Sequence, residues 1–291
     1  MLRKPPVSWK RIERGYTPAQ RWVVTLDGGS SAFLKMGDDI LRPGAAHTTA
    51  DGLRKEYRVY SQLGASFLPD MLGWMDEPAA TILALEDLSG AFWPPPWSQP
   101  HVDTVLEALT ALHATRLPGA ASVYENIDAD PTSGGWNEVA RDPSSFLTLG
   151  ITSMDWLERA LPELLLACGK ARINGDDLCH FDVRSDNICI RGEQAILIDW
   201  NWMAIGNGQL DTAFWLPSLA IEGGPPPERT MPTAPDLAAV VSGFFAARAG
   251  LPVIPALPLV RDIQLAQLRT ALPWAVRALG LPPLDGPNAP A

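Results

Sequence analysis

A polar loop followed by two short apolar strands decides the fold of this chain. The loop reads His180-Phe181-Asp182-Val183-Arg184-Ser185-Asp186-Asn187, and the chain continues through Ile188-Cys189-Ile190 and a turn at Arg191-Gly192-Glu193 to Ile198-Asp199-Trp200. The run from Ile188 to Ile198 predicts a strand, a glycine-containing turn and a second strand. Such a hairpin returns Asp199 to the loop that holds Asn187. We therefore expect Asp182, Asn187 and Asp199 to face one cavity.

These residue types are the ones that phosphoryl transfer requires. A carboxylate such as Asp182 can orient an attacking hydroxyl group and accept its proton. Oxygen ligands such as those of Asn187 and Asp199 can hold Mg²⁺ on nucleotide phosphates. Taken alone, Asp-x-x-x-x-Asn is most often a solvated turn, and Asp199 could be an ordinary carboxylate at a strand end. Their combination around two apolar strands favours a phosphoryl-transfer site.

The pattern His-x-Asp-x-x-x-x-Asn followed by Ile-Asp-Trp resembles the catalytic loop and metal-binding strand of the aminoglycoside phosphotransferase family. Members of that family are small-molecule kinases with a protein-kinase-like fold. The resemblance implies an α+β, bilobal fold. An N-terminal lobe, residues 1–87, would bind the nucleotide with an antiparallel sheet and one helix, and a mostly helical C-terminal lobe, residues 88–291, would hold the catalytic loop and the acceptor.

The resemblance also implies roles for residues around the loop. Arg184 stands where protein kinases carry a lysine, so it is a catalytic candidate that could stabilise the transferring phosphoryl group. Pairing with Asp186 on the surface explains the same arginine equally well. His180, together with Asp211 further along the chain, is expected to support the catalytic loop, and for Asp211 the family role is to accept backbone hydrogen bonds from that loop.

The first third of the chain supplies the expected nucleotide-binding parts in order. Residues 21–26 and 31–35 predict two strands joined by a turn at Asp27-Gly28-Gly29-Ser30. Lys35 closes the second strand, where the family places the lysine that contacts the α and β phosphates. Residues 49–64 have helical spacing, and Glu56 on this helix is expected to pair with Lys35 and hold it in position.

Two further nucleotide contacts are expected from the main chain. A third strand, residues 81–85, ends at the place of the family's hinge between lobes, so the carbonyl of Glu86 and the amide of Leu88 are expected to contact the purine. Because these contacts are made by main-chain atoms, the side chains do not indicate whether the nucleotide is ATP or GTP. Gly15 is the one glycine in the expected phosphate-covering stretch, residues 13–21, where protein kinases have Gly-x-Gly-x-x-Gly. Backbone amides near Gly15 could approach the phosphates.

The remaining chain predicts a connector and helices. Residues 90–100 are too rich in proline for a helix or central strand, and Trp93 and Trp97 there are expected to pack rather than to stack on a substrate. Helices are expected at residues 102–113, 154–166 and 260–279, and one from Asp236 as N-cap. The stretch 223–235 reads as a loop, and the proline-rich tail, residues 281–291, is expected to be disordered or loosely attached.

Composition and charge narrow the class of protein. The chain has 291 residues, of which 46% are hydrophobic, without an apolar run long enough to span a bilayer or a signal-peptide core. Cys168, Cys179 and Cys189 lack metal-ligand spacing, so reduced thiols are expected. These features favour a cytoplasmic protein, a monomer or weak dimer, that binds no membrane. A net charge of −10 argues against nucleic acid as a partner.

The sequence therefore predicts a phosphotransferase that uses Mg²⁺ and ATP or GTP to phosphorylate a hydroxyl group of a small molecule. The acceptor is expected to be an aminoglycoside or another antibiotic, an activity that gives antibiotic resistance. A choline-like, amino-acid or sugar metabolite and a non-catalytic, nucleotide-binding regulator are the alternatives. The negative charge suits a cationic acceptor, although it also suits simple solubility. Carboxylates that could bind such an acceptor, if they are not merely solvated, are Glu222, Asp262, Asp155 and Glu158.

Overall fold

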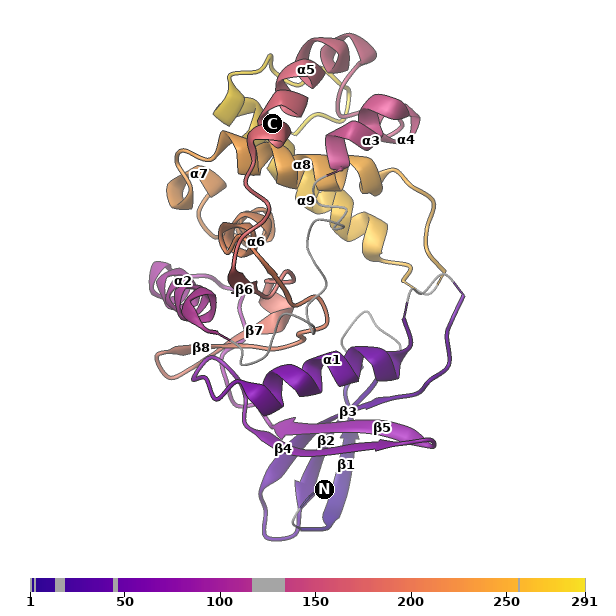
Figure 1. Ribbon diagram of the computed structural model, residues 1–291, viewed down its shortest axis with the longest axis vertical. Helices are drawn as coiled ribbons and strands as arrows, with labels where there is room; N and C mark the ends of the chain where they lie inside the picture. Colours follow the sequence, from indigo (N-terminus) through magenta and orange to yellow (C-terminus); the bar gives the residue numbers. More distant parts are fainter. Residues whose placement is uncertain are drawn as a thin grey trace.

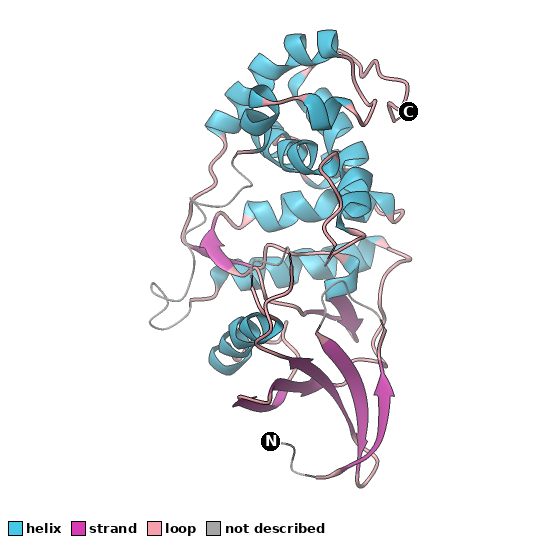
Figure 2. Cartoon of the chain, turned by 90° about the vertical axis from the view of Figure 1, so that its right-hand side faces the viewer, coloured by secondary structure: helices cyan, strands magenta, loops and turns pink. Residues whose placement is uncertain are grey.

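The computed structural model describes residues 2, 4–13, 19–43, 47–116, 134–255 and 257–290. Strands gather at one end of the elongated molecule and helices at the other, as both views show (Figures 1 and 2). A short strand hairpin, which carries the polar loop quoted above, lies between these two parts (Figure 1). The fold is α+β, as expected.

The N-terminal part is an antiparallel sheet with the strand order β1-β2-β3-β5-β4. Its strands are β1 (Pro6–Arg11), β2 (Gln20–Leu26), β3 (Ser31–Gly37), β4 (Met71–Glu77) and β5 (Ala80–Glu86). The predicted strands β2, β3 and β5 are confirmed. Gly28 and Gly29 have φ values of 90° and 85° in the β2–β3 turn, a conformation that favours glycine.

Helix α1 (Thr49–Gln62) packs against β3, β4 and β5. Thr48 and Asp51 form a capping box at its first turn. Leu53, Val59 and Tyr60 bury one face of the helix, and Glu56 lies buried on the same face. The predicted helix is confirmed, and it ends at Gln62, two residues before Gly64.

The C-terminal part is mostly helical, with a core that includes Trp136, Trp156, Trp215 and Trp274. Its helices are α2 (Gln99–Ala114), α3 (Gly135–Arg141), α4 (Ser144–Leu147), α5 (Met154–Lys170), α6 (Gln209–Ile221), α7 (Pro227–Thr230), α8 (Pro235–Ala249) and α9 (Val260–Leu279). Two strand pairs support the polar loop: β6 (Asp177–Cys179) with β9 (Ala204–Gly206), and β7 (Ile188–Arg191) with β8 (Gln194–Leu197). The predicted hairpin and the four predicted helices are confirmed.

Three details differ from the sequence predictions. Helix α8 has Ala234 as its N-cap and Pro235 as its first residue, so Asp236 lies inside the first turn. The predicted loop at residues 223–235 contains the short helix α7. The strands β1 and β4 were not predicted. Strand β1 is exposed along its whole length, and its alternation of apolar residues is limited to Val7 and Trp9, which is too short a pattern to predict a strand.

The C-terminal tail is attached to the helical part, contrary to the expectation of a loose segment. The Asp285 carboxylate accepts hydrogen bonds from the backbone amide and the hydroxyl of Ser153, at 2.7 and 2.6 Å. The Trp156 indole donates to the Pro282 carbonyl at 2.8 Å. Ser153 is the N-cap of α5, so the tail holds the start of that helix.

The helices and the cysteines bear on two predictions from the composition of the chain. Among the described residues, we find no helix that combines the length and the apolar character needed to cross a bilayer. Cys168, Cys179 and Cys189 are all free thiols, as predicted.

Candidate active site

A buried ion pair joins β3 to α1. Lys35 Nζ donates to both carboxylate oxygens of Glu56, at 2.8 and 2.9 Å, and the two side chains are almost completely buried. Lys35 Nζ also lies 3.3 Å from Asp199 Oδ1. The lysine thus connects the sheet, helix α1 and the segment after β8, as the resemblance implies for Lys35 and Glu56.

One lysine is shared by two carboxylates, and the pKa values reflect this. Burial would lower the pKa of Lys35, but Asp199 and Glu56 outweigh it and raise that pKa. Burial raises the pKa of Glu56 to about 7, because Lys35 offsets it only in part and Asp199 adds repulsion. Burial would also raise the pKa of Asp199, yet the charges of Lys35 and Arg21 lower it overall. Of the two carboxylates, Asp199 is therefore the one whose ionised form is favoured more strongly.

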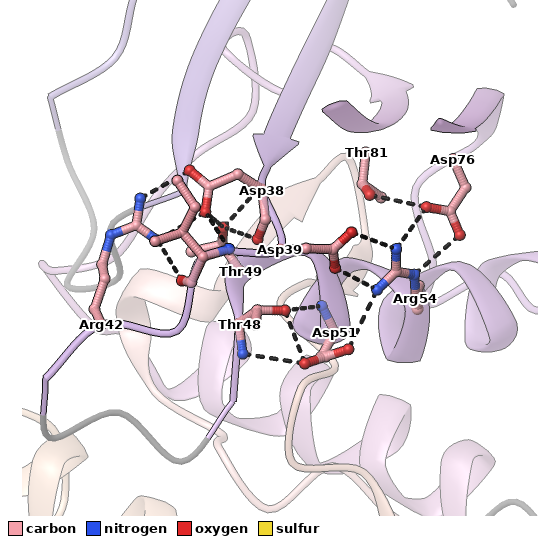
Figure 3. Close-up of polar contacts among 10 residues, drawn as sticks. Asp38, Asp39, Arg42, Thr48, Thr49, Asp51, Arg54, Asp76 and Thr81 are labelled. Carbon is pink, nitrogen blue, oxygen red and sulfur yellow. Dashed lines mark hydrogen bonds and ion pairs between the residues drawn. The ribbon is translucent and has the colours of Figure 1, made fainter. Parts of the chain in front are cut away.

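Exposed ion pairs hold α1 on the sheet (Figure 3). Arg54, two residues before Glu56, donates to Asp76 of β4 with two nitrogens, each at 2.9 Å. It also contacts Asp39, in the connection from β3, at 2.7 Å and Asp51 of its own helix at 3.3 Å. Asp39 and Asp76 thereby tie the middle of α1 to the two segments beside it.

The polar loop, residues 180–187, brings Asp182 and Asn187 together. Asn187 Nδ2 donates to the carbonyl and to Oδ2 of Asp182, at 2.8 and 2.9 Å. These two bonds fix the orientation of the Asn187 amide, so Oδ1 is the atom that Asn187 can offer to a metal. Burial raises the pKa of Asp182, although Arg184 opposes the shift.

Arg184 lies beside the two aspartates of the same loop. Its Nε is 3.5 Å from Asp182 Oδ1. Nε and Nη2 also donate to the two carboxylate oxygens of Asp186, at 3.1 and 2.9 Å. Both sequence interpretations of Arg184, a neighbour of the reacting groups and a partner of Asp186, thus agree with its position.

Asp199 follows the β7–β8 hairpin, which returns to the loop as expected. The Ile198 amide donates to the Asn187 carbonyl at 3.0 Å. Asp199 has a φ of 67°, an uncommon value for a residue other than glycine and one found at functional sites. Asn201 donates from its side chain to Asp199 Oδ1. The Asp199 side chain is 21% exposed, so a ligand can reach it.

This donor set fits a hard divalent cation. Asp199 offers a carboxylate that its surroundings keep ionised, and Asn187 offers an amide oxygen whose orientation is fixed. Oxygen ligands of these kinds suit Mg²⁺, which completes its shell with water and phosphate oxygens. The side chains of Asn187 and Asp199 could therefore hold Mg²⁺ beside a nucleotide.

Asp211 supports the loop from the first turn of α6. Its buried carboxylate accepts from the backbone amides of His180 and Phe181, at 2.8 and 2.7 Å, and contacts His113 Nε2 at 3.0 Å. His113, Cys179 and Asp211 form a group whose possible ligand atoms lie within 4.8 Å of one another. Because hydrogen bonds already occupy the Asp211 carboxylate, we interpret the group as a support for the loop and not as a metal centre.

His180 links the loop to the strand before Asp199. Its Nδ1 faces the Asp182 amide at 3.2 Å and so accepts a hydrogen bond. The proton of the neutral ring is therefore on Nε2, which donates to the Ile198 carbonyl at 2.9 Å. The ring also packs against Trp200, with centroids 4.4 Å apart. These contacts agree with the supporting role that the resemblance implies for His180.

The expected hinge lies between β5 and α2. The Glu86 side chain forms an ion pair with Arg191 at 2.5 Å. The Leu88 carbonyl accepts from the Ala91 amide and from the Trp93 indole, at 3.0 Å each. The Trp93 side chain therefore packs, as predicted. These two bonds use the Leu88 carbonyl, whereas the group of Leu88 that is expected to contact the nucleotide is its amide. The remaining nucleotide prediction, Gly15, lies outside the described residues.

Sequence reasoning missed several supporting contacts. Nothing in the local pattern signals that Arg54 would reach β4. The contact between Asn201 and Asp199 is different, because the two residues lie only two positions apart in the sequence and such a contact could have been suspected.

The candidates for binding a cationic acceptor lie in different places. Glu222 accepts hydrogen bonds from Trp97 and Ser185. The other acceptor candidates, Asp155, Glu158 and Asp262, are exposed, and the first two lie on α5 at the end of the molecule far from the sheet (Figure 1).

Comparisons with known proteins give matches among solved structures. A search of protein-family models finds no match to the chain, and a search of curated proteins finds none either. An aminoglycoside phosphotransferase from Alicyclobacillus acidocaldarius superposes with a TM-score of 0.61 at 15% identity, over 93% of this chain and 90% of that one. A choline/ethanolamine kinase family protein from Mesorhizobium loti gives 0.57 at 15% identity, over 94% and 91%.

A third solved structure contains a nucleotide analogue. It is an amicoumacin kinase in complex with AMP-PNP, Ca²⁺ and Ami, and it superposes with a TM-score of 0.52 at 15% identity, over 97% of this chain and 84% of that one. Similarities at such low identity establish the fold and leave the activity to be argued from the site. The chain has the protein-kinase-like fold of these small-molecule kinases.

Proposed function

We propose that this protein is a phosphotransferase that moves the γ-phosphate of ATP or GTP to a hydroxyl group of a small molecule. One observation carries the proposal. Lys35 Nζ contacts Glu56 at 2.8 Å and Asp199 at 3.3 Å, which joins three distant segments at one point. The third of these segments follows directly on the β7–β8 hairpin, which begins immediately after Asn187. The fold shared with known small-molecule kinases supports the same activity.

The residues divide the reaction between them. Asp182 hydrogen-bonds the acceptor hydroxyl and takes its proton as the hydroxyl oxygen forms a bond to the γ-phosphorus. The bond from that phosphorus to the bridging oxygen breaks, and the nucleoside diphosphate leaves. Lys35 neutralises charge on the phosphates, and Arg184 stabilises the transferring group. Mg²⁺ held by Asn187 and Asp199 would supply further charge neutralisation.

The raised pKa of Asp182 suits its part in this reaction. A carboxylate whose pKa is raised by burial is a stronger base toward the proton of a bound hydroxyl group. The hydrogen bond from Asn187 Nδ2 to Asp182 Oδ2 orients the Asp182 carboxylate, so its other oxygen faces a fixed direction. The arrangement supports proton removal from a bound hydroxyl group better than a purely structural role for Asp182.

We propose an aminoglycoside or another hydroxylated antibiotic as the acceptor. The net charge of −10 favours a cationic molecule, and two of the superposed structures are an aminoglycoside phosphotransferase and an amicoumacin kinase. A choline-like metabolite is the second candidate, because the protein from Mesorhizobium loti superposes about as well.

The test is an assay of nucleoside diphosphate release with Mg²⁺ and ATP or GTP. The panel holds aminoglycosides, other hydroxylated antibiotics, and choline-like, sugar and amino-acid metabolites. Asp182→Asn should abolish turnover and leave nucleotide affinity nearly unchanged, whereas Glu163→Gln, a control at an exposed position of α5, should behave as wild type. The proposal is wrong if no acceptor is phosphorylated and nucleotide binding does not respond to Asp199→Ala.

A further inference from the structure

Glu222 follows the last residue of α6, the helix that carries Asp211 in its first turn. Each oxygen of the Glu222 carboxylate accepts a hydrogen bond from the protein. The Trp97 indole donates to Oε2 at 2.8 Å, and the Ser185 hydroxyl donates to Oε1 at 2.5 Å. Ser185 belongs to the catalytic loop and lies between Asp182 and Asn187 in sequence.

The catalytic loop is thus bound to both ends of one helix. Asp211, at the start of α6, holds the backbone amides of His180 and Phe181. Glu222, at its end, holds the side chain of Ser185. A helix is a rigid element, and a site supported at two points on such an element keeps its geometry better than one supported at a single point.

The second partner of Glu222 extends this support to the connector before α2. The Trp97 ring packs against Trp215 of α6, with centroids 5.4 Å apart and an interplanar angle of 64°. Its indole nitrogen is therefore directed toward Glu222 by packing as well as by the hydrogen bond. Trp97 packs as the sequence predicts and, in addition, helps to hold the Glu222 carboxylate in place.

We propose that Glu222 is a positioning residue that acts through Ser185 to fix the second half of the catalytic loop, and that it does not bind the acceptor by its charge. This inference rests on the proposed function. Ser185 is two residues before Asn187, and Asn187 in turn orients the Asp182 carboxylate. A displaced Ser185 would therefore shift the base and a metal ligand together, which slows the transfer step and leaves nucleotide binding by Lys35 in place.

Two substitutions of the same residue separate positioning from charge. In Glu222→Gln the amide oxygen can still accept from Trp97, and the amide nitrogen can donate to the Ser185 oxygen, because a hydroxyl group is also an acceptor. In Glu222→Ala both bonds are lost. If Glu222 acts by holding Ser185 in place, Glu222→Gln should keep most of the activity and Glu222→Ala should lose it. If it binds a cationic acceptor, both variants should raise the KM of that acceptor.

The experiment measures kcat and KM for nucleotide and acceptor in wild type, Glu222→Gln, Glu222→Ala, Ser185→Ala and the double variant Ser185→Ala/Glu222→Ala. We expect kcat to fall on the order of 10-fold in Glu222→Ala and in Ser185→Ala, because small displacements of reacting groups are costly in rate. The nucleotide KM should stay within about 2-fold of wild type, and the double variant should be no slower than Glu222→Ala, as coupled residues require. Ser218→Ala, which removes a hydroxyl bonded within α6 to the Trp215 carbonyl, is the control.

Three results would overturn the inference. The first is a Glu222→Gln variant with the same rise in acceptor KM as Glu222→Ala. The second is a Ser185→Ala variant that is as active as wild type, a result that does not depend on whether Glu222→Ala folds. The third is a folded wild-type protein without turnover on any acceptor, which contradicts the proposed function itself and removes the basis of the inference with it.

Discussion

Helices α1 and α6 both deliver carboxylates to the site, but they are held there in different ways. On α1, Glu56 meets Lys35 in the interior, while Arg54 ties the surface of the helix to neighbouring segments by exposed ion pairs (Figure 3). On α6, Asp211 is itself buried and binds the backbone of the polar loop. Exposed ion pairs contribute little free energy, whereas buried bonds to a charged acceptor contribute more. The polar loop, residues 180–187, is therefore held by buried bonds to one carboxylate, whereas the polar contacts of α1 are divided between the buried Lys35–Glu56 pair and weak surface pairs around Arg54.

Removal of the buried carboxylate on α6 should have the largest effect on stability. In Asp211→Ala, the amides of His180 and Phe181 lose a charged acceptor, and we expect the free energy of unfolding to fall by about 3 kcal/mol or more. Activity should be lost as well, because the catalytic loop is no longer held. Urea denaturation, followed by circular dichroism, measures the change.

The control for this variant is Asp262→Ala. Asp262 is an exposed carboxylate in the first turn of α9, and its removal should change the free energy of unfolding by about 0.5 kcal/mol or less. Equal losses in the two variants would show that the Asp211 hydrogen bonds do not hold the loop.

Glu56→Gln should separate activity from stability. The variant keeps the size of the side chain but loses the charge that anchors Lys35, so kcat/KM for the nucleotide should fall roughly 10²-fold. Lys35 still has Asp199 at 3.3 Å, and a neutral side chain is less costly to bury, so the free energy of unfolding should change by about 1 kcal/mol or less. A urea midpoint as low as that of Asp211→Ala would contradict the distinction between the two helices.

The pH dependence of the free energy of unfolding tests the raised pKa of Glu56 in the folded protein. Burial raises its pKa in the folded protein to about 7, from an ordinary value of 4.5. The folded chain therefore binds this proton more tightly than the unfolded chain does. Its contribution to stability is present in full below the ordinary value and is lost as the pH rises through the folded value.

Glu56→Gln lacks this titration and provides the reference. The free energy of unfolding of wild type, measured relative to the variant by urea denaturation, should decrease between about pH 5 and pH 7. An increase over that interval would show that Lys35 outweighs burial and lowers the pKa of Glu56.

Local patterns account for what the sequence predicted well. The β2–β3 turn at Gly28 and Gly29, helix α1 and the β7–β8 hairpin each depend on residues close together in the chain. The pairing of Lys35 with Glu56 was reached through the resemblance, which places two distant residues in one site.

The elements that were missed have little local signal. Strand β1 is exposed on both faces, and its alternation of apolar residues is limited to Val7 and Trp9. The tail is held at Ser153 by one carboxylate, that of Asp285, and such a contact leaves no periodic pattern. The bond between Ser185 and Glu222 joins residues 37 positions apart and depends on where α6 ends. Contacts of this kind are set by packing between elements, which the sequence does not display.

The smallest effect is expected from Arg54→Gln, which removes the exposed ion pairs of α1. Because such pairs are weak, the free energy of unfolding should fall by about 1 kcal/mol or less, and kcat/KM for the nucleotide should fall a few-fold as α1 loosens around Glu56. The difference from wild type should shrink at high salt, since exposed charges are screened. Urea denaturation and nucleotide kinetics at two salt concentrations measure both effects.

Arg42→Gln is the matched control. Arg42 precedes α1 in the chain and pairs with Asp38, whereas Arg54 pairs with Asp76 of β4. It should leave nucleotide kinetics unchanged at either salt concentration. If Arg54→Gln instead lowered kcat/KM as far as Glu56→Gln does, and high salt did not reduce the loss, the surface contacts of α1 would be as important as the buried contacts of α6. The position of Lys35 would then depend on the Arg54 pairs, and the two helices would be held equally firmly by different means.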